Sequence, residues 1–177
     1  PSEKLAQSLA ILKALQDDGK VAIQANDLSR VHKERLMASG FLQEVMKGWY
    51  IVTSPNETAG DTTAWYTAFW TFCGEYLHHR FNNNWCLSPE QSLLLHSGNW
   101  TVPEQLLVRS PTAGNKMTSL LHHTALLDIR TTIPDAKDIV IKNKMRLYSL
   151  ASALIGCTPK FFITHKNDMQ VALSMIA

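Results

Sequence analysis

Residues 29–52 have the sequence SRVHKERLMASGFLQEVMKGWYIV, which combines one helical segment with one hairpin. Asn26 and Asp27 are cap-type residues ahead of a helix that starts at about Ser29, and Gly40 is the kind of residue that ends a helix. Apolar residues on both sides of Lys47-Gly48 predict two short strands joined by a tight turn. The stretch therefore predicts a helix over about residues 29–39, followed by a β-hairpin.

The residues before this stretch predict one further helix and one short strand. Leucines recur at helical spacing between Ser2, an N-cap candidate, and Asp18, and Gly19 follows as the stop. The apolar run 21–23 is long enough only for a bridging strand. Helix, short strand, helix and hairpin is the order of a winged helix-turn-helix, so the sequence predicts a winged-helix domain at residues 1–52.

A winged helix binds DNA by placing its second helix in the major groove and its hairpin on the phosphates. The candidate DNA contacts are Arg30, His32, Lys33, Arg35 and Lys47. Four of them are cations, which attract phosphate, and the histidine adds a polar contact. We therefore predict double-stranded DNA, and specifically the protein's own operator, as the partner.

The sequence leaves two other interpretations of this helix open. Residues 1–60 contain seven Lys and Arg against seven Asp and Glu, so the segment is neutral as a whole. A neutral module is also compatible with protein docking alone, or with a purely structural role. On the helix, Val31 is predicted to share one side with Leu36, and Arg30 to face elsewhere.

The rest of the chain predicts a second domain. Residues 53–61, TSPNETAGD, are rich in turn-forming residues and predict a linker. A long helix with many aromatic side chains follows and extends through Phe81, which is typical of a core element. Short strands and helices come after it, so residues 62–177 are predicted to form a small mixed α+β domain. The fold class is therefore α+β, with the winged helix first.

The composition is that of a folded, soluble protein. The 177 residues are 45% hydrophobic and 18% charged, with a net charge of +2, so any basic surface must be local. Three widely spaced cysteines cannot all pair in disulfides, which predicts a cytoplasmic location. Since no run approaches the ~18 apolar residues of a membrane span, we expect no membrane partner.

No motif in the chain predicts catalysis. The adjacent pairs His78-His79 and His122-His123 point apart on a helix or strand, and no Cys-x-x-Cys occurs. Ser88 and His96 would lie about 12 Å apart along a helix, too far for a nucleophile and its base. Gly114-Asn115-Lys116 is too short a motif for a phosphate cradle. We predict no catalytic residue, no metal and no cofactor for this chain.

Three segments carry a resemblance to a known family. They are GFLQEVMKGWY at 40–50, WCLSPEQS at 85–92 and VPEQLLVRSP at 102–111. Together they resemble the N-terminal region of one subfamily of bacterial Fic-domain proteins, over essentially the whole chain. The layout is also similar to antitoxins of the AbiEi type, in which a winged helix precedes a small α+β domain and serves operator binding and toxin control.

The Fic resemblance implies that the full-length protein is a protein adenylyltransferase, which transfers AMP from ATP to a hydroxyl of a target protein. The family's His–Pro–Phe motif, followed by Gly–Asn–Gly–Arg, is absent from this chain. The stretch His96-Ser97-Gly98-Asn99 contains similar residues but has the wrong spacing. The resemblance therefore implies a regulatory, DNA-binding module with its catalytic domain beyond residue 177, as in a toxin–antitoxin system. The alternative is a protein-interaction module that recruits the AMP-transfer target or restrains the Fic domain.

Overall fold

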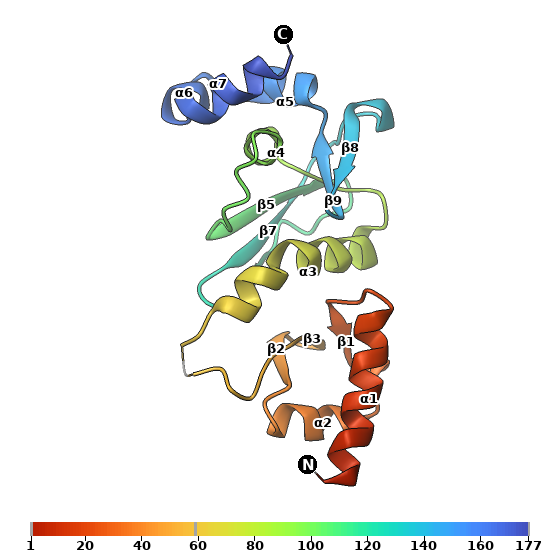
Figure 1. The fold of residues 1–177 in the computed structure, drawn as a ribbon. Helices are drawn as coiled ribbons and strands as arrows, with labels where there is room; N and C mark the ends of the chain where they lie inside the picture. The colour runs from red at the N-terminus through yellow and green to blue at the C-terminus, as the bar shows by residue number, and fades with distance from the viewer. Residues whose placement is uncertain (1, 59, 177) are drawn as a thin grey trace. The chain divides into compact units, whose positions relative to one another are not determined.

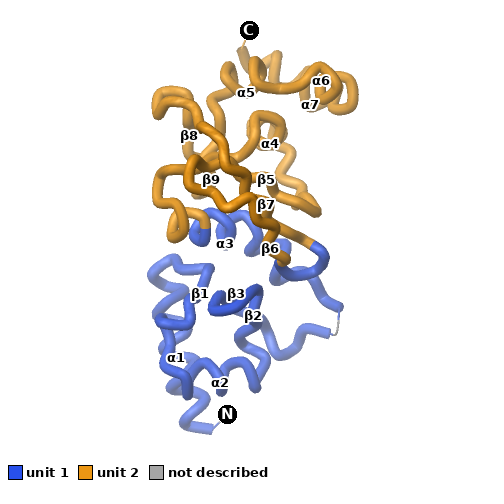
Figure 2. The backbone as a smooth tube through the Cα atoms, turned by 180° about the vertical axis from the view of Figure 1, so that it is seen from behind, with its two compact units in different colours: residues 1–76, 120–123 blue, residues 77–119, 124–177 orange. Residues whose placement is uncertain are grey.

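The computed structural model describes residues 2–58 and 60–176, which form a mixed α and β structure (Figure 1). The chain divides into two compact units (Figure 2). Unit 1 comprises residues 1–76 and 120–123, and unit 2 comprises residues 77–119 and 124–177. The main division therefore lies inside a helix, after residue 76. The described part of the predicted linker, 53–61, forms turns without a helix or strand.

Unit 1 combines helices with a three-stranded antiparallel sheet. Its elements are α1 (Glu3–Asp17), β1 (Ile23–Gln24), the 3-10 helix η1 (Ala25–Asp27), α2 (Arg30–Ala38), β2 (Leu42–Met46), β3 (Trp49–Val52) and the first part of α3 (Thr63–Phe81). The strand order is β1-β3-β2, because β3 pairs with both other strands. The hairpin turns at Lys47-Gly48, where Gly48 has a φ of 82° that favours glycine.

Local capping chemistry explains where the two helices before the hairpin begin. The Ser2 hydroxyl accepts a hydrogen bond from the Leu5 amide at the start of α1. The Ser29 hydroxyl accepts one from the His32 amide at the start of α2. Such a cap satisfies an amide that has no partner inside the helix, and it stabilises the helix by about 1 kcal/mol.

One apolar cluster joins α1, α2 and the sheet. Its buried members are Leu12, Ile23, Leu28, Leu36, Leu42 and Tyr50. Leu36 is the member on α2 and is completely buried. Burying a leucine side chain contributes about 1.5–3 kcal/mol, so this contact fixes which side of α2 faces inward.

The first part of α3 packs on the sheet of unit 1. The carboxylate of Glu75 accepts hydrogen bonds from the Val21 and Ala22 amides at 3.0 and 3.1 Å. The Trp49 ring meets the rings of Phe72 and Tyr76 edge-on, at centroid distances of 6.3 and 5.1 Å. These contacts agree with the prediction of α3 as a core element.

Unit 2 contains a mixed sheet, a separate hairpin and several helices. Its elements after α3 are β4 (Cys86–Leu87), α4 (Pro89–His96), β5 (Gln105–Ser110), β6 (Met117–Ser119), β7 (Ala125–Arg130), η2 (Ala136–Asp138), β8 (Ile139–Lys142), β9 (Met145–Tyr148), α5 (Leu150–Gly156), α6 (Pro159–Thr164) and α7 (Lys166–Ser174). The sheet order is β4-β5-β7-β6, in which β5 and β7 are parallel. The strands β8 and β9 form a two-stranded antiparallel hairpin.

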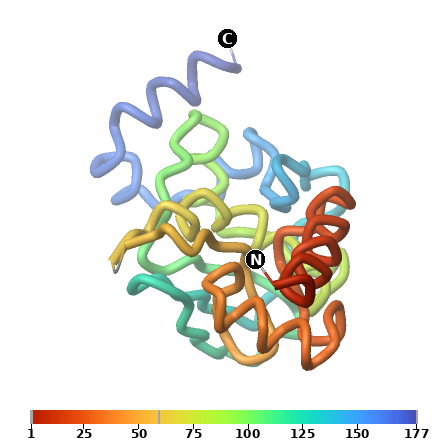
Figure 3. The backbone as a smooth tube through the Cα atoms, turned by 60° about the horizontal axis from the view of Figure 1, so that its bottom comes forward, coloured from red at the N-terminus to blue at the C-terminus, as the bar shows by residue number. Residues whose placement is uncertain are grey.

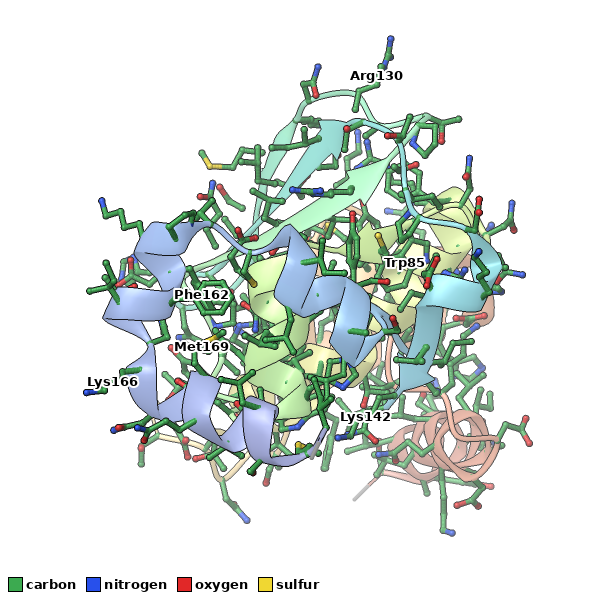
Figure 4. The ribbon with its side chains drawn as sticks, turned by 90° about the horizontal axis from the view of Figure 1, so that it is seen from above. Trp85, Arg130, Lys142, Phe162, Lys166 and Met169 are labelled. Carbon is green, nitrogen blue, oxygen red and sulfur yellow. The ribbon has the colours of Figure 1, made fainter. Side chains whose placement is uncertain are left out.

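The helices at the end of unit 2 pack around α4. Their buried cluster contains Leu93, Ala153, Cys157, Phe161, Met169 and Ala172. Both α5 and α7 contact α4 (Figures 1 and 3). Figure 4 shows Phe162 and Met169 beside these helices. The short helix α6 is absent from the sequence prediction, although Thr158 caps it by accepting from the Phe161 amide.

The described residues contain no helix that is both long enough and apolar enough to cross a membrane. Cys73, Cys86 and Cys157 are all buried free thiols. Burial raises the pKa of the Cys86 thiol and of the Cys157 thiol to about 11. It raises the pKa of the Cys73 thiol further still. Neutral buried thiols of this kind act as small apolar side chains.

Candidate nucleic-acid interface

The solvent-facing side of α2 is neutral and partly apolar. Its exposed residues are Arg30, Val31, Glu34, Met37 and Ala38. The predicted grouping of Val31 with Leu36 is wrong, because Val31 is 59% exposed whereas Leu36 is completely buried. Five residues along an α-helix correspond to about 140° around its axis, so the two side chains point to different sides.

Arg30 lies at the start of α2 and forms an ion pair with Glu34. The Arg30 Nε and Glu34 Oε1 atoms are 2.7 Å apart, and both side chains are well exposed. The hydrogen bond and the opposite charge raise the pKa of Arg30 and lower that of Glu34. Solvent screens an exposed pair of this kind, so a competing anion can replace the Glu34 carboxylate.

Lys33 contacts the β2–β3 hairpin at Tyr50. Its Nζ atom is 5.6 Å from the centroid of the Tyr50 ring, in a cation–π contact. The Tyr50 hydroxyl donates to Glu44 Oε1 at 3.3 Å, and burial together with Glu44 raises the pKa of the tyrosine. The half-buried Lys33 side chain therefore connects α2 with β3.

Arg35 and His32 contact α1 through the buried side chain of Ser8. Arg35 Nη1 donates to Ser8 Oγ and to the Lys4 carbonyl, both at 2.9 Å. Ser8 Oγ also lies 2.9 Å from His32 Nδ1 and 3.1 Å from the Lys4 carbonyl. These polar contacts hold α1 against α2, so neither Arg35 nor His32 is presented to solvent in the way that Arg30 is.

Lys47 is exposed at the turn of the β2–β3 hairpin. The turn itself is fixed, because the Gly48 amide donates to Glu44 Oε1 at 3.3 Å and the Gly48 carbonyl accepts from the Ala25 amide at 2.9 Å. Of the five predicted contacts, Arg30 and Lys47 are thus the two that are fully exposed. Lys33, His32 and Arg35 are partly buried in contacts within unit 1.

Sequence reasoning missed the larger group of cations, which belongs to unit 2. Unit 1 contains seven Lys and Arg against nine Asp and Glu, a net charge of −2. Unit 2 contains ten against six, a net charge of +4. Part of this excess lies in residues 137–146, with four cations (Lys137, Lys142, Lys144 and Arg146) and one carboxylate, Asp138. The net charge of each half of the chain is the sequence feature that could have revealed these cations.

The glycine turn at Gly114 is organised around a buried carboxylate. Asp128 accepts from the Gly114 amide at 2.8 Å and the Lys116 amide at 3.1 Å, and it pairs with Arg80 at 2.7 Å. These two backbone amides are therefore already hydrogen-bonded within the protein. In the described part of the chain, no group of three or more His, Cys, Asp or Glu side chains is placed to hold a metal ion.

A cavity of about 500 Å³ in unit 1 lies beside the first turns of α3. The charged side chains that line it already have partners. Lys20 pairs with Asp27 at 2.5 Å, and Asp61 accepts from the Thr63 amide at 2.8 Å. Glu57 likewise accepts from the Ser54 amide at 3.0 Å. The charged side chains of the cavity are therefore already engaged within unit 1.

Comparison of this chain with protein-family models, with curated proteins and with solved structures finds no match. The similarity to Fic-domain proteins stays a prediction that depends on the three sequence segments, and the similarity to AbiEi antitoxins stays a prediction that depends on the layout.

Proposed function

We propose that unit 1 is a DNA-binding module of the winged-helix type with a regulatory role. The observation that carries this proposal is the order α1-β1-η1-α2-β2-β3 together with the sheet order β1-β3-β2. In this arrangement α2 is the helix that enters the major groove, and the β2–β3 hairpin is the wing beside it. Leu36 holds α2 on the core and leaves its opposite side to the DNA.

Arg30 and Lys47 are the proposed phosphate contacts. Both are exposed, one at the start of α2 and one at the hairpin turn. A phosphate can replace Glu34 as the partner of Arg30, because a guanidinium binds phosphate in the same forked geometry as carboxylate. Arg35 and His32 act as positioning residues that fix α2 against α1. Lys33 supports the wing through Tyr50.

The proposed DNA is the region upstream of the protein's own gene, and the enzyme under control is the Fic adenylyltransferase implied by the resemblance. The test is fluorescence anisotropy of the whole chain with that upstream duplex and with an unrelated duplex, each at two salt concentrations. We expect tighter binding to the upstream duplex and an affinity that falls as salt rises. Equal binding to both duplexes would contradict the proposal that the upstream region is the operator. Binding to neither duplex would contradict the DNA-binding function.

Protein docking is a second candidate, favoured by one specific observation. Val31 and Met37 are 59% and 39% exposed, about 120° apart around the solvent-facing side of α2, and unit 1 has a net charge of −2. The partner would then be the AMP-transfer target or the attached Fic domain. The Val31→Ser/Met37→Ser variant separates the candidates, since docking through this side requires the apolar side chains. Phosphate binding through Arg30 and Lys47 does not require them.

A further inference from the structure

Two half-buried arginines of unit 2 lie near the buried thiol of Cys86. Arg109 on β5 is the direct partner of Cys86 on β4 in the antiparallel register, so the two side chains lie on the same face of the sheet. Arg146 on β9 donates from Nε to the carbonyl of Trp85, the residue before Cys86, at 2.9 Å. Burial raises the pKa of the Cys86 thiol, and the positive charges of both arginines act against this effect. Both guanidinium groups therefore lie close enough to one thiol to act on it.

Tyr148 fixes the orientation of Arg109. Arg109 Nη1 donates to the Tyr148 hydroxyl at 3.1 Å, and the guanidinium lies 5.9 Å from the centroid of that ring. The backbone of Tyr148 is held by α4, because its amide donates to the Ser92 hydroxyl at 3.0 Å and its carbonyl lies 2.7 Å from His96 Nε2. Arg146 precedes Tyr148 by two residues on β9, so both side chains lie on the same face of this strand. Strands and their contacts with α4, rather than a loop, therefore place both arginines.

The contacts of the two guanidinium groups are with uncharged atoms. Neither arginine forms an ion pair with a carboxylate in the described part of the chain. A guanidinium has five N–H groups, and the hydrogen bond to the Tyr148 hydroxyl or to the Trp85 carbonyl uses one of them. These contacts orient each guanidinium and leave its other N–H groups available. Because a cation that is partly removed from water is stabilised by a negative partner, the position of both arginines favours an anionic ligand.

We propose that Arg109 and Arg146 form a binding site for a phosphate group. A phosphate monoester carries about two negative charges at pH 7, which match the two cations. Its oxygens accept hydrogen bonds from the forked N–H groups of a guanidinium in bidentate geometry. Tyr148 is the positioning residue that orients Arg109. The proposal does not rest on the proposed function, because every residue of this site belongs to unit 2.

The test is isothermal titration calorimetry of the whole chain with inorganic phosphate and with ribose 5-phosphate. Tighter binding of ribose 5-phosphate assigns the site to a phosphate ester, and equal binding of both assigns it to the free ion. Arg109→Gln and Arg146→Gln should each weaken the affinity by about 10- to 100-fold, because hydrogen bonds between charged groups are the strong class. Tyr148→Phe should weaken it by a smaller factor, since the ring stays and only the hydroxyl is lost.

The matched control is Arg130→Gln. Arg130 is also an arginine of unit 2 whose Nε donates to a backbone carbonyl, that of Ala113, at 2.8 Å. Figure 4 shows Arg130 and Trp85 on different parts of the unit, so the control should keep the wild-type affinity. Equal affinities in the control and the two site variants, whether weakened or unchanged, overturn the proposal. A wild-type chain that binds neither phosphate compound, or binds acetate as tightly as phosphate, overturns it as well.

Arg109→Lys distinguishes phosphate binding from a role in folding. Lysine keeps the charge but lacks the forked geometry, so we expect a urea midpoint near that of the wild type together with a weaker affinity for phosphate. Wild-type affinity in this variant contradicts the forked contact. Phosphate binding by a chain that binds no duplex supports the site and contradicts only the proposed function. If the site variants weaken duplex binding and neither phosphate compound binds, the arginines contact nucleic acid and the proposal is overturned.

Discussion

At the scale of single residues, Ser8 explains why two of the predicted DNA contacts face the protein interior. Its hydroxyl has one proton to donate and two lone pairs to accept with. The Ser8 hydroxyl accepts a hydrogen bond from Arg35 Nη1 through one lone pair, and it donates a hydrogen bond to the Lys4 carbonyl. The remaining lone pair accepts from His32 Nδ1 in the tautomer that places a proton on this nitrogen. The hydroxyl is fully satisfied only in this arrangement.

We predict that Ser8→Ala destabilises unit 1. Ser8 is completely buried, and its loss leaves Arg35 and His32 without a shared acceptor. Each hydrogen bond lost in this way costs about 0.5–1.5 kcal/mol, while Arg35 keeps its bond to the Lys4 carbonyl. Urea unfolding measures the change, with Ser174→Ala at an exposed position of α7 as the control. Equal midpoints for the two variants would contradict the role assigned to Ser8.

Cys86 gives a prediction for the pH dependence of stability. Burial raises the pKa of its thiol from 9.0 to about 11 in the folded protein. Its stabilising contribution is therefore fully present below pH 9.0, and it is lost as pH rises toward about 11. The free energy of unfolding should decrease over this pH range, and Cys86→Ala should decrease less. If the free energy of unfolding changed with pH in the same way in the wild type and the variant, the thiol would not contribute to the pH dependence of stability.

At the scale of elements, α2 has one side that stabilises the fold and one that is free for binding. Leu36 is completely buried, whereas Val31 is 59% exposed. We expect Leu36→Ala to lower the free energy of unfolding by about 2–5 kcal/mol. Val31→Ala should change it by no more than about 0.5 kcal/mol. Urea unfolding of the two variants compares both sides of one helix, and similar losses would mean that α2 packs differently.

Helix starts could be predicted from the sequence because capping is local. The hydroxyls of Ser2, Ser88 and Ser149 each accept from the amide three residues later, as their positions before helical segments indicate. The cap of α2 is Ser29, whereas the sequence pointed to Asn26 and Asp27. The parallel pairing of β5 with β7 could not be predicted in this way. The strand β6 lies between them in the chain and pairs with the far side of β7, so the order depends on contacts distant in sequence.

The candidate site shows the same division between local and distant causes. The exposure of Arg30 and Lys47 follows from a helix start and a hairpin turn, both of which the sequence indicates. The environment of His32 and Arg35 is set by Ser8, which is 24 and 27 residues away in the chain. The same separation explains why the sequence alone suggested that His32 and Arg35 face DNA.

At the scale of the whole molecule, the net charge of +2 is the sum of −2 in unit 1 and +4 in unit 2. A module proposed to bind DNA therefore lies in the more acidic unit, and its binding depends on a few exposed cations rather than on overall charge.

The most direct test of the account is the salt dependence of duplex binding in single variants of unit 1. Arg30→Ala and Lys47→Ala should each lower the slope of log K against log salt by about 0.9. Lys13→Ala removes the same charge from an exposed site on α1, where it pairs with Asp17, and should leave the slope unchanged. Unchanged slopes for Arg30→Ala and Lys47→Ala, or no binding of any duplex by the wild-type chain, would contradict DNA recognition through α2 and the β2–β3 hairpin.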